Sequence, residues 1–117
     1  MSLIKENAFQ NDIEKVIFSE GSEKLIIEKK SFAYSKVKNI VIPARVTEIG
    51  DGSFTCFQLL EFEIPKNSEL KRIGSKALSQ TKIEKIFIPK HVTIIDGGAF
   101  KFCDNLKTVE FDENSEL

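Results

Sequence analysis

Apolar residues recur along this chain with a period of about 23 residues. Each copy contains a triplet whose last two apolar residues are separated by one position, the alternation typical of a half-buried β-strand. The middle members of the triplets are 24, 22, 24 and 23 residues apart. The five triplets are Ile13/Val16/Phe18, Val37/Ile40/Ile42, Leu59/Phe62/Ile64, Ile83/Ile86/Ile88 and Leu106/Val109/Phe111. A fixed period of this length indicates a solenoid.

A second apolar column has the same period. It consists of Ile4, Ile27, Ile49, Ile73 and Ile95, and five residues after each isoleucine comes Phe9, Phe32, Phe54, Leu78 or Phe100. The residue before each of these is small, namely Ala8, Ser31, Ser53, Ala77 or Ala99. A small residue in every copy predicts close approach between successive turns, with the larger side chain filling the space beside it.

Each copy supplies a strand without a nearby hairpin partner, so the strand must pair with the strand of the next turn. This arrangement predicts a parallel sheet with right-handed crossovers. One copy cannot fold alone, because about six buried apolar side chains at ~1.5–3 kcal/mol each do not offset the ordering of about 23 residues at ~1–2 kcal/mol each. Stacking buries both faces of every internal copy and makes stability a sum over neighbours.

The copies also alternate in length, which makes the repeating unit a pair of turns. From the residue after a triplet to the next isoleucine, the chain advances by eight or six residues in alternation: 19–27, 43–49, 65–73 and 89–95. We therefore expect alternate turns to bulge along one edge. The bulges carry Glu20, Glu23, Glu69, Glu113 and Glu116.

The motifs of residues 95–111 resemble the BspA-like class of leucine-rich repeat, whose pattern is Ile-Pro-x-x-Val-x-x-Ile-Gly-x-x-Ala-Phe-x-x-Cys-x-x-Leu. The resemblance covers nearly all of residues 4–117 and recurs five times. The departures are local: Leu78 replaces Phe, the glycine after the isoleucine occurs only as Gly50 and Gly74, and Cys occurs only as Cys56 and Cys103. These departures do not threaten the fold.

The expected fold is an α/β-type right-handed leucine-rich-repeat solenoid of about five repeats of 22–24 residues. It is β-rich, with one parallel sheet on the concave side, little helix, and irregular turns, short strands or single helical turns on the other side. Residues 1–117 form a single domain. Because no polar capping segment is present, we interpret the chain as an excised part of a longer array. The alternative is that another molecule covers the open ends, for example by end-to-end self-association.

Composition excludes several partners. The 17 basic and 18 acidic residues are interleaved and give a net charge of −1, so no basic face for nucleic acid is expected. No apolar run is long enough for membrane insertion. No signal peptide is recognisable at the beginning of the chain.

The cysteines are predicted to be unpaired. Cys56 and Cys103 occupy the same column two turns apart. Adjacent turns lie ~4.8 Å apart, which separates their Cα atoms by about 10 Å, whereas a disulfide requires ~7 Å or less. We interpret both as small buried residues of the turn rather than as nucleophiles.

No group of residues has the spacing of a catalytic, cofactor-binding or metal-binding site. His91 is the only histidine and lacks companions, so we expect it at the surface. The segments 50–52 and 96–98 are rich in Gly and Asp, but neither completes a phosphate-binding motif, and we interpret them as turns. We therefore expect a protein that is not an enzyme and requires no cofactor.

The outward positions of the predicted strands are the candidate contact surface. One column is Ile17, Val41, Glu63, Phe87 and Glu110, and the neighbouring column is Lys15, Asn39, Glu61, Lys85 and Thr108. Two interpretations of the apolar members stay open: a contact patch for a partner, or β-propensity at exposed strand sites. If the face assignment is right, Phe87→Glu leaves folding intact and weakens partner binding.

The resemblance implies a function. BspA-like proteins are cell-surface proteins of bacteria and of some parasitic protists, and several are implicated in adhesion to host matrix proteins. We therefore expect a non-enzymatic protein-binding module at a cell surface or secreted, with a host or extracellular-matrix protein as partner. The alternative is a purely structural spacer whose surface binds no specific ligand.

Overall fold

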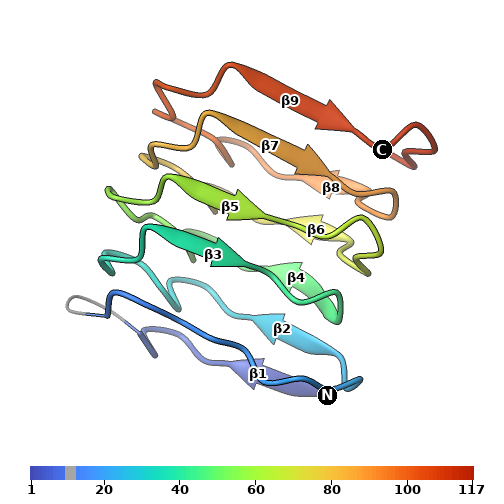
Figure 1. Cartoon of the computed structure of the whole chain (residues 1–117), viewed down its shortest axis with the longest axis horizontal. Helices are drawn as coiled ribbons and strands as arrows, with labels where there is room; N and C mark the ends of the chain where they lie inside the picture. Colours follow the sequence, from blue (N-terminus) through green and yellow to red (C-terminus); the bar gives the residue numbers. More distant parts are fainter. Residues whose placement is uncertain (10–12) are drawn as a thin grey trace.

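The computed structural model describes residues 1–9 and 13–117. The chain winds into a solenoid that has strands on a front face and a rear face, joined by turns along the left and right edges (Figure 1). Every pair of hydrogen-bonded strands among these residues is parallel. None of the described residues is helical.

The rear face is one continuous sheet, formed by the isoleucine column. Its five strands stack in the order β1-β2-β4-β6-β8. Their bounds are β1 (Ser2–Ile4), β2 (Leu25–Ile27), β4 (Val46–Ile49), β6 (Arg72–Ile73) and β8 (Ile94–Ile95). Isoleucines of successive turns are direct partners in register, as Ile49 is with Ile73 and Ile73 with Ile95. The period of the sequence is therefore also the period of the hydrogen-bond ladder.

The front face holds the strands predicted from the triplets, in two separate sheets. The strands are β3 (Asn39–Val41), β5 (Glu61–Glu63), β7 (Lys85–Ile88) and β9 (Thr108–Phe111). β3 pairs with β5 and β7 with β9, whereas β5 and β7 belong to different sheets. The first triplet is not a strand, since residues 13–18 have no assigned secondary structure.

The prediction of a single parallel sheet was therefore wrong, although the parallel pairing and the short strands on the other side are confirmed. The sequence argument gave one principal strand to each turn, at the alternating triplet. However, any extended segment that recurs once per turn meets its own copy in the next turn, and both can hydrogen-bond as a parallel pair. The isoleucine column satisfies this condition as well as the triplet does, so both faces carry sheets.

The core lies between the two faces and is built from the predicted columns. Phe32 and Phe54 are fully buried and stack with their ring centroids 4.9 Å apart. Phe9 continues the stack at 5.1 Å from Phe32. Leu78 takes the same place in the next turn and is also fully buried. The ring spacing matches the ~4.8 Å between strands, so the rings of Phe9, Phe32 and Phe54 stack turn upon turn, and Leu78 continues the column.

The turns on the left edge follow the rear strands and repeat one backbone conformation. The third residue after each isoleucine has a positive φ: Asn7, Lys30, Gly52, Lys76 and Gly98, with values from 55° to 73°. The small residue that follows is buried in four turns: Ser31, Ser53, Ala77 and Ala99. The predicted close approach of successive turns at this column is thus confirmed.

The predicted alternation in turn length is also present. On the right edge, residues 64–71 connect β5 to β6, whereas only 42–45 connect β3 to β4 and 89–93 connect β7 to β8. The pair of turns is therefore the structural repeat.

Candidate functional site

The candidate contact residues lie on the front face with their side chains directed outward. In β3, β5 and β7, the inward residues Ile40, Phe62 and Ile86 are only 3%, 5% and 3% exposed. Nine of the ten candidates are exposed, and Phe87 is half-buried: Lys15, Ile17, Asn39, Val41, Glu61, Glu63, Lys85, Phe87, Thr108 and Glu110. The predicted alternation of inward and outward positions therefore holds on these strands.

The candidates do not form one uniform surface. Lys15 and Ile17 precede the first front strand and lie in a segment that is not a strand. Ile17 and Val41 are 80% and 56% exposed, so they bury little apolar area. The hollowed part of the face lies farther along the solenoid, over β5, β7 and β9.

Two adjoining hollows of about 670 and 680 Å³ meet at Phe87. Both are lined by Glu63, Phe87 and Glu110, which come from three successive front strands. Phe87 and Glu110 are direct partners in the β7–β9 register. Glu63 stands on β5, across the break between the two front sheets. The structure thus places one aromatic ring among carboxylates at the centre of a groove.

The groove is acidic. Its lining contains six carboxylates and two lysines: Glu61, Glu63, Glu84, Glu110, Asp112, Glu113, Lys66 and Lys85. None of these eight forms an ion pair with any residue in the described part of the chain. A surface with uncompensated charge of one sign attracts a partner of the opposite sign. Arginine or lysine side chains therefore complement the groove.

Sequence reasoning missed several groove residues. Glu84 and Leu60 belong to the column immediately before the two candidate columns, and Lys66 and Glu113 belong to the right-edge turns. The acidic bulges did predict Glu113 as an edge residue. Whether the other missed residues line the groove depends on how neighbouring turns are placed beside one another, and a single column of the sequence does not show this.

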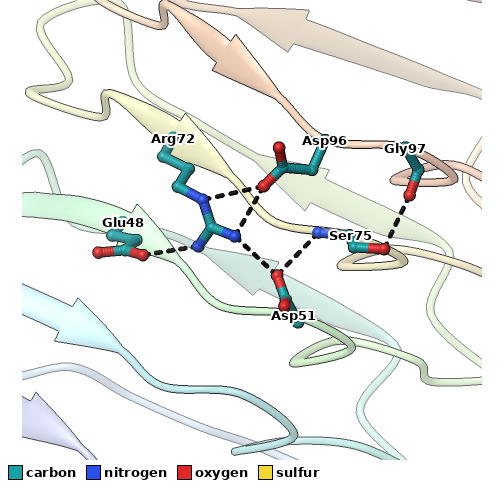
Figure 2. A network of polar contacts seen from close by, with 6 residues as sticks. All are labelled: Glu48, Asp51, Arg72, Ser75, Asp96 and Gly97. Carbon is teal, nitrogen blue, oxygen red and sulfur yellow. Dashed lines mark hydrogen bonds and ion pairs between the residues drawn. The ribbon is translucent and has the colours of Figure 1, made fainter.

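The rear face carries a network of ion pairs centred on Arg72 (Figure 2). The guanidinium donates to Glu48 at 2.6 Å, to Asp51 at 2.9 Å and to Asp96 at 2.9 Å, and a second guanidinium nitrogen lies 2.7 Å from the same Asp96 oxygen. Asp51 also accepts a hydrogen bond from the Ser75 backbone N–H at 2.9 Å. Burial lowers the pKa of Arg72, but the hydrogen bonds to the carboxylates, first that to Glu48, outweigh it and raise the pKa. One cation thus ties together three successive rear turns.

The repeats of this solenoid match those of a known family. The family model for the BspA type leucine rich repeat region matches residues 25–116 in six copies. The chain belongs to the BspA-type leucine-rich repeat family. A search of curated proteins finds no match.

Two solved structures resemble this BspA-type solenoid. A leucine-rich cell surface protein from Faecalibacterium prausnitzii matches with a TM-score of 0.63 and 20% identity over 80% of this chain and 33% of its own. A leucine-rich repeat protein from Bacteroides ovatus has a TM-score of 0.49 and 26% identity over 89% of this chain and 34% of its own. This chain therefore spans about a third of each of these proteins. The first likeness shows the fold.

The cysteines of the BspA-type pattern are unpaired thiols, in agreement with the prediction. The thiol of Cys56 donates to the Phe32 carbonyl oxygen at 3.0 Å, and that of Cys103 donates to the Leu78 carbonyl oxygen at 2.9 Å. Burial raises the pKa of the Cys56 thiol above its usual range, which keeps the thiol protonated. Both cysteines therefore act as small donors that join one turn to the turn before it, and Cys56 is buried as predicted, whereas Cys103 is only partly buried.

The partners of these thiols reproduce the two-turn unit. Cys56 Sγ lies 3.3 Å from the Ser35 hydroxyl, and Cys103 Sγ lies 3.3 Å from the Thr81 hydroxyl. In both cases a hydroxyl residue in one turn meets a cysteine in the next. The BspA-type pattern has one cysteine per copy, whereas this chain has only two cysteines, which lie two turns apart. The spacing of its cysteines thus matches the two-turn repeat.

The remaining candidates for chemistry lie at the surface. His91 Nδ1 is 2.8 Å from Glu116 Oε2, and both side chains are about half exposed. Gly52 and Gly98 occupy the positive-φ turn position, as expected for turn segments. Within residues 1–9 and 13–117, no three His, Cys, Asp or Glu side chains are grouped to hold a metal ion. The same residues contain no helix that could cross a membrane.

Proposed function

We propose that this BspA-type chain is a non-enzymatic protein-binding module that contacts its partner through the front face around Phe87. The observation that carries the proposal is the meeting of two hollows at Phe87, between Glu63 and Glu110. An aromatic ring near the centre of a patch, with charged groups around it, is the arrangement from which binding hot spots are built.

The charge of the groove supports a basic partner surface. An arginine or lysine side chain that enters between Glu63 and Glu110 gains charge-assisted hydrogen bonds from the carboxylates. The same cation can rest on the Phe87 ring, which attracts it through the ring quadrupole. Because no groove carboxylate has an internal ion pair in the described structure, docking breaks none.

The proposed place of action is a cell surface, and the proposed partner is a host or extracellular-matrix protein. The family supports a repeat module for protein interaction. One solved structural relative is named as a cell surface protein. The alternative, a spacer without a ligand, is an outcome of the experiment below.

The test is binding of the purified chain to a panel of immobilised extracellular-matrix proteins by surface plasmon resonance. For a protein that the wild type binds, Phe87→Ala is expected to raise Kd about tenfold or more. Alanine tests the ring without adding a charge to an acidic surface, which Phe87→Glu would do. Glu63→Lys and Glu110→Lys are expected to slow association and to reduce its dependence on salt.

Leu3→Ala is the matched control, because Leu3 is 46% exposed on β1 of the rear sheet. It should bind as the wild type does. Thermal melts of all variants separate loss of contact from loss of fold. Equal binding by Phe87→Ala and wild type would refute the proposed face, and failure of the wild type to bind any protein of the panel would favour the spacer.

A further inference from the structure

Exposed aromatic residues form a ridge along the left edge, away from the front-face groove. Tyr34, Phe57 and Phe102 are 55%, 48% and 59% exposed, and each belongs to a different left-edge turn. In the remaining turn of this series the corresponding residue is Gln80. We call Tyr34, Phe57, Gln80 and Phe102 the edge ridge. The left-edge turns that carry it stack directly on one another (Figure 1).

Three of the four ridge residues have a left-handed backbone conformation, and Phe57 is the exception. Tyr34, Gln80 and Phe102 have φ values of 64°, 63° and 60°. A left-handed conformation favours glycine or asparagine and is uncommon for a bulky residue. At an exposed site the ring gains little burial to offset this strain. Strained, exposed aromatic residues that do not contribute to the core are features of binding surfaces.

A hollow of about 530 Å³ opens between two of the aromatic rings. It is lined by Phe57, Gln80, Thr81, Lys82, Phe102, Asp104 and Asn105. Phe57 and Phe102 stand two turns apart, which corresponds to about 10 Å along the solenoid. The hollow therefore has an aromatic ring at each end and polar side chains between them, and the Lys101 ammonium lies over the Phe102 ring, 5.2 Å from its centroid.

The polar side chains of the hollow are available to a ligand. In the part of the chain that the structure describes, the side chains of Gln80, Lys82 and Asn105 make no hydrogen bond. Asp104 likewise has no ion pair there. Among the lining residues one lysine balances one aspartate, and Lys101 beside Phe102 adds a single further cation, so the hollow has no strong charge of either sign.

From this arrangement we propose that the edge ridge binds a neutral oligosaccharide between Phe57 and Phe102. A pyranose ring has a face of C–H groups that stacks on an aromatic ring, and hydroxyl groups around its rim. The amides of Gln80 and Asn105 can each donate to and accept from such hydroxyls. Few polar groups placed beside apolar rings are the usual composition of a small-molecule site.

The spacing of the ridge extends the site beyond one sugar. Tyr34 and Phe57 are adjacent, with ring centroids 5.7 Å apart and planes tilted by 57°. Tyr34 thus continues the series of rings by one turn. A glycan lying along the solenoid axis would meet Tyr34, Phe57 and Phe102 in succession, with Gln80 between the last two rings. Contacts with the sugar rings would therefore recur along the solenoid axis with the spacing of its turns.

The test is isothermal titration of the intact chain with neutral hexasaccharides of glucose, mannose, xylose and N-acetylglucosamine. At least one of these is expected to bind, and Phe57→Ala and Phe102→Ala are each expected to weaken that binding about tenfold. Tyr34→Ala should weaken it less, because Tyr34 lies outside the hollow. Gln80→Ala should weaken it through lost hydrogen bonds.

Leu3→Ala serves as the control for an exposed apolar residue outside the ridge, and circular dichroism melts verify that every variant is folded. Absence of binding by all four hexasaccharides at millimolar concentration would overturn the proposal. Binding that survives Phe57→Ala together with Phe102→Ala would also overturn it. A proline-rich peptide that binds the ridge while the sugars do not would identify a peptide surface instead.

Discussion

Gly50 lies where the backbone of one turn passes close to the backbone of the turn before it. A Cβ at this position would lie 2.5 Å from the Lys29 nitrogen and 2.7 Å from the Ile27 carbonyl oxygen. Gly50 N–H also donates to that Ile27 oxygen at 2.7 Å. Because the neighbours are backbone atoms that belong to the rear ladder, they cannot rotate away as a side chain would.

Gly50→Ala is therefore expected to reduce the free energy of unfolding by about 1–3 kcal/mol, the usual cost of forcing an added group into a packed site. Gly97→Ala is the matched control, because a Cβ on Gly97 would meet no atom within 4 Å. It should change stability by less than about 0.5 kcal/mol. Urea denaturation of both variants measures the difference, and equal midpoints would contradict the close approach.

Single residues also explain why the position after the isoleucine is a glycine in some turns and an aspartate in another. Gly74, in the turn after Gly50, leaves space for Asp51, whose backbone nitrogen would lie 2.7 Å from a Cβ there. In the next turn the same column is occupied by Asp96, whose carboxylate binds Arg72 instead. Gly74 leaves room for Asp51, and Asp96 binds Arg72, so both residues of this column contribute to the same ion-pair network.

At the scale of elements, Arg72 joins the edges of three rear strands. Glu48 of β4 is its direct partner in the β4–β6 register. Asp51 and Asp96 come from the turns that follow β4 and β8. Arg72 is 29% exposed in its side chain, and its three partners range from 35% to 53%. Solvent screens part of each interaction, but the single cation also relieves repulsion among three carboxylates.

We expect Arg72→Met to lower the free energy of unfolding by about 1–2 kcal/mol, since charge-assisted hydrogen bonds are worth more than neutral ones but are screened at this exposure. The loss should shrink as salt rises, because salt weakens the repulsion among the remaining carboxylates. Lys71→Met, a neighbouring exposed cation outside the network, should cost little. Comparable losses in the two variants at low salt would show that the network does not stabilise the sheet.

At the scale of the whole molecule, every internal turn depends on the two turns beside it. Ile73 is fully buried, and its partners in the rear ladder are Ile49 on one side and Ile95 on the other. In a solenoid, stability is approximately a sum of terms within turns and between nearest neighbours. A defect in one turn should therefore weaken the adjacent turns more than distant ones.

Ile73→Ala is expected to reduce the free energy of unfolding by about 2–5 kcal/mol, through lost burial and the cavity left behind. Hydrogen exchange should increase most in β4, β6 and β8 and least in β1. Ile94→Ala removes the same atoms from the adjacent residue, which is 48% exposed, and should have a much smaller effect. Uniform acceleration of exchange in β1 and β8 would mean that the solenoid unfolds as one unit instead.

The sequence by itself determined the features that recur in every turn because they are buried. Both apolar columns, the small residue before the aromatic ring, the alternation of turn lengths and the unpaired cysteines follow from positions that recur, because a buried site tolerates few residue types and leaves a periodic record. The outward direction of Val41 and Glu63 followed from the alternation in the strands. These predictions needed only the distance from one copy to the next.

The tertiary structure decided how the surfaces of neighbouring turns combine. The continuous rear sheet, the break between β5 and β7, the acidic groove at Phe87, the Arg72 network and the edge ridge all depend on side chains that are more than 20 residues apart in the chain. Exposed positions are free to vary, so no periodic pattern marks them. They form a surface only because the winding of the chain brings the variable residues of one turn beside those of the next.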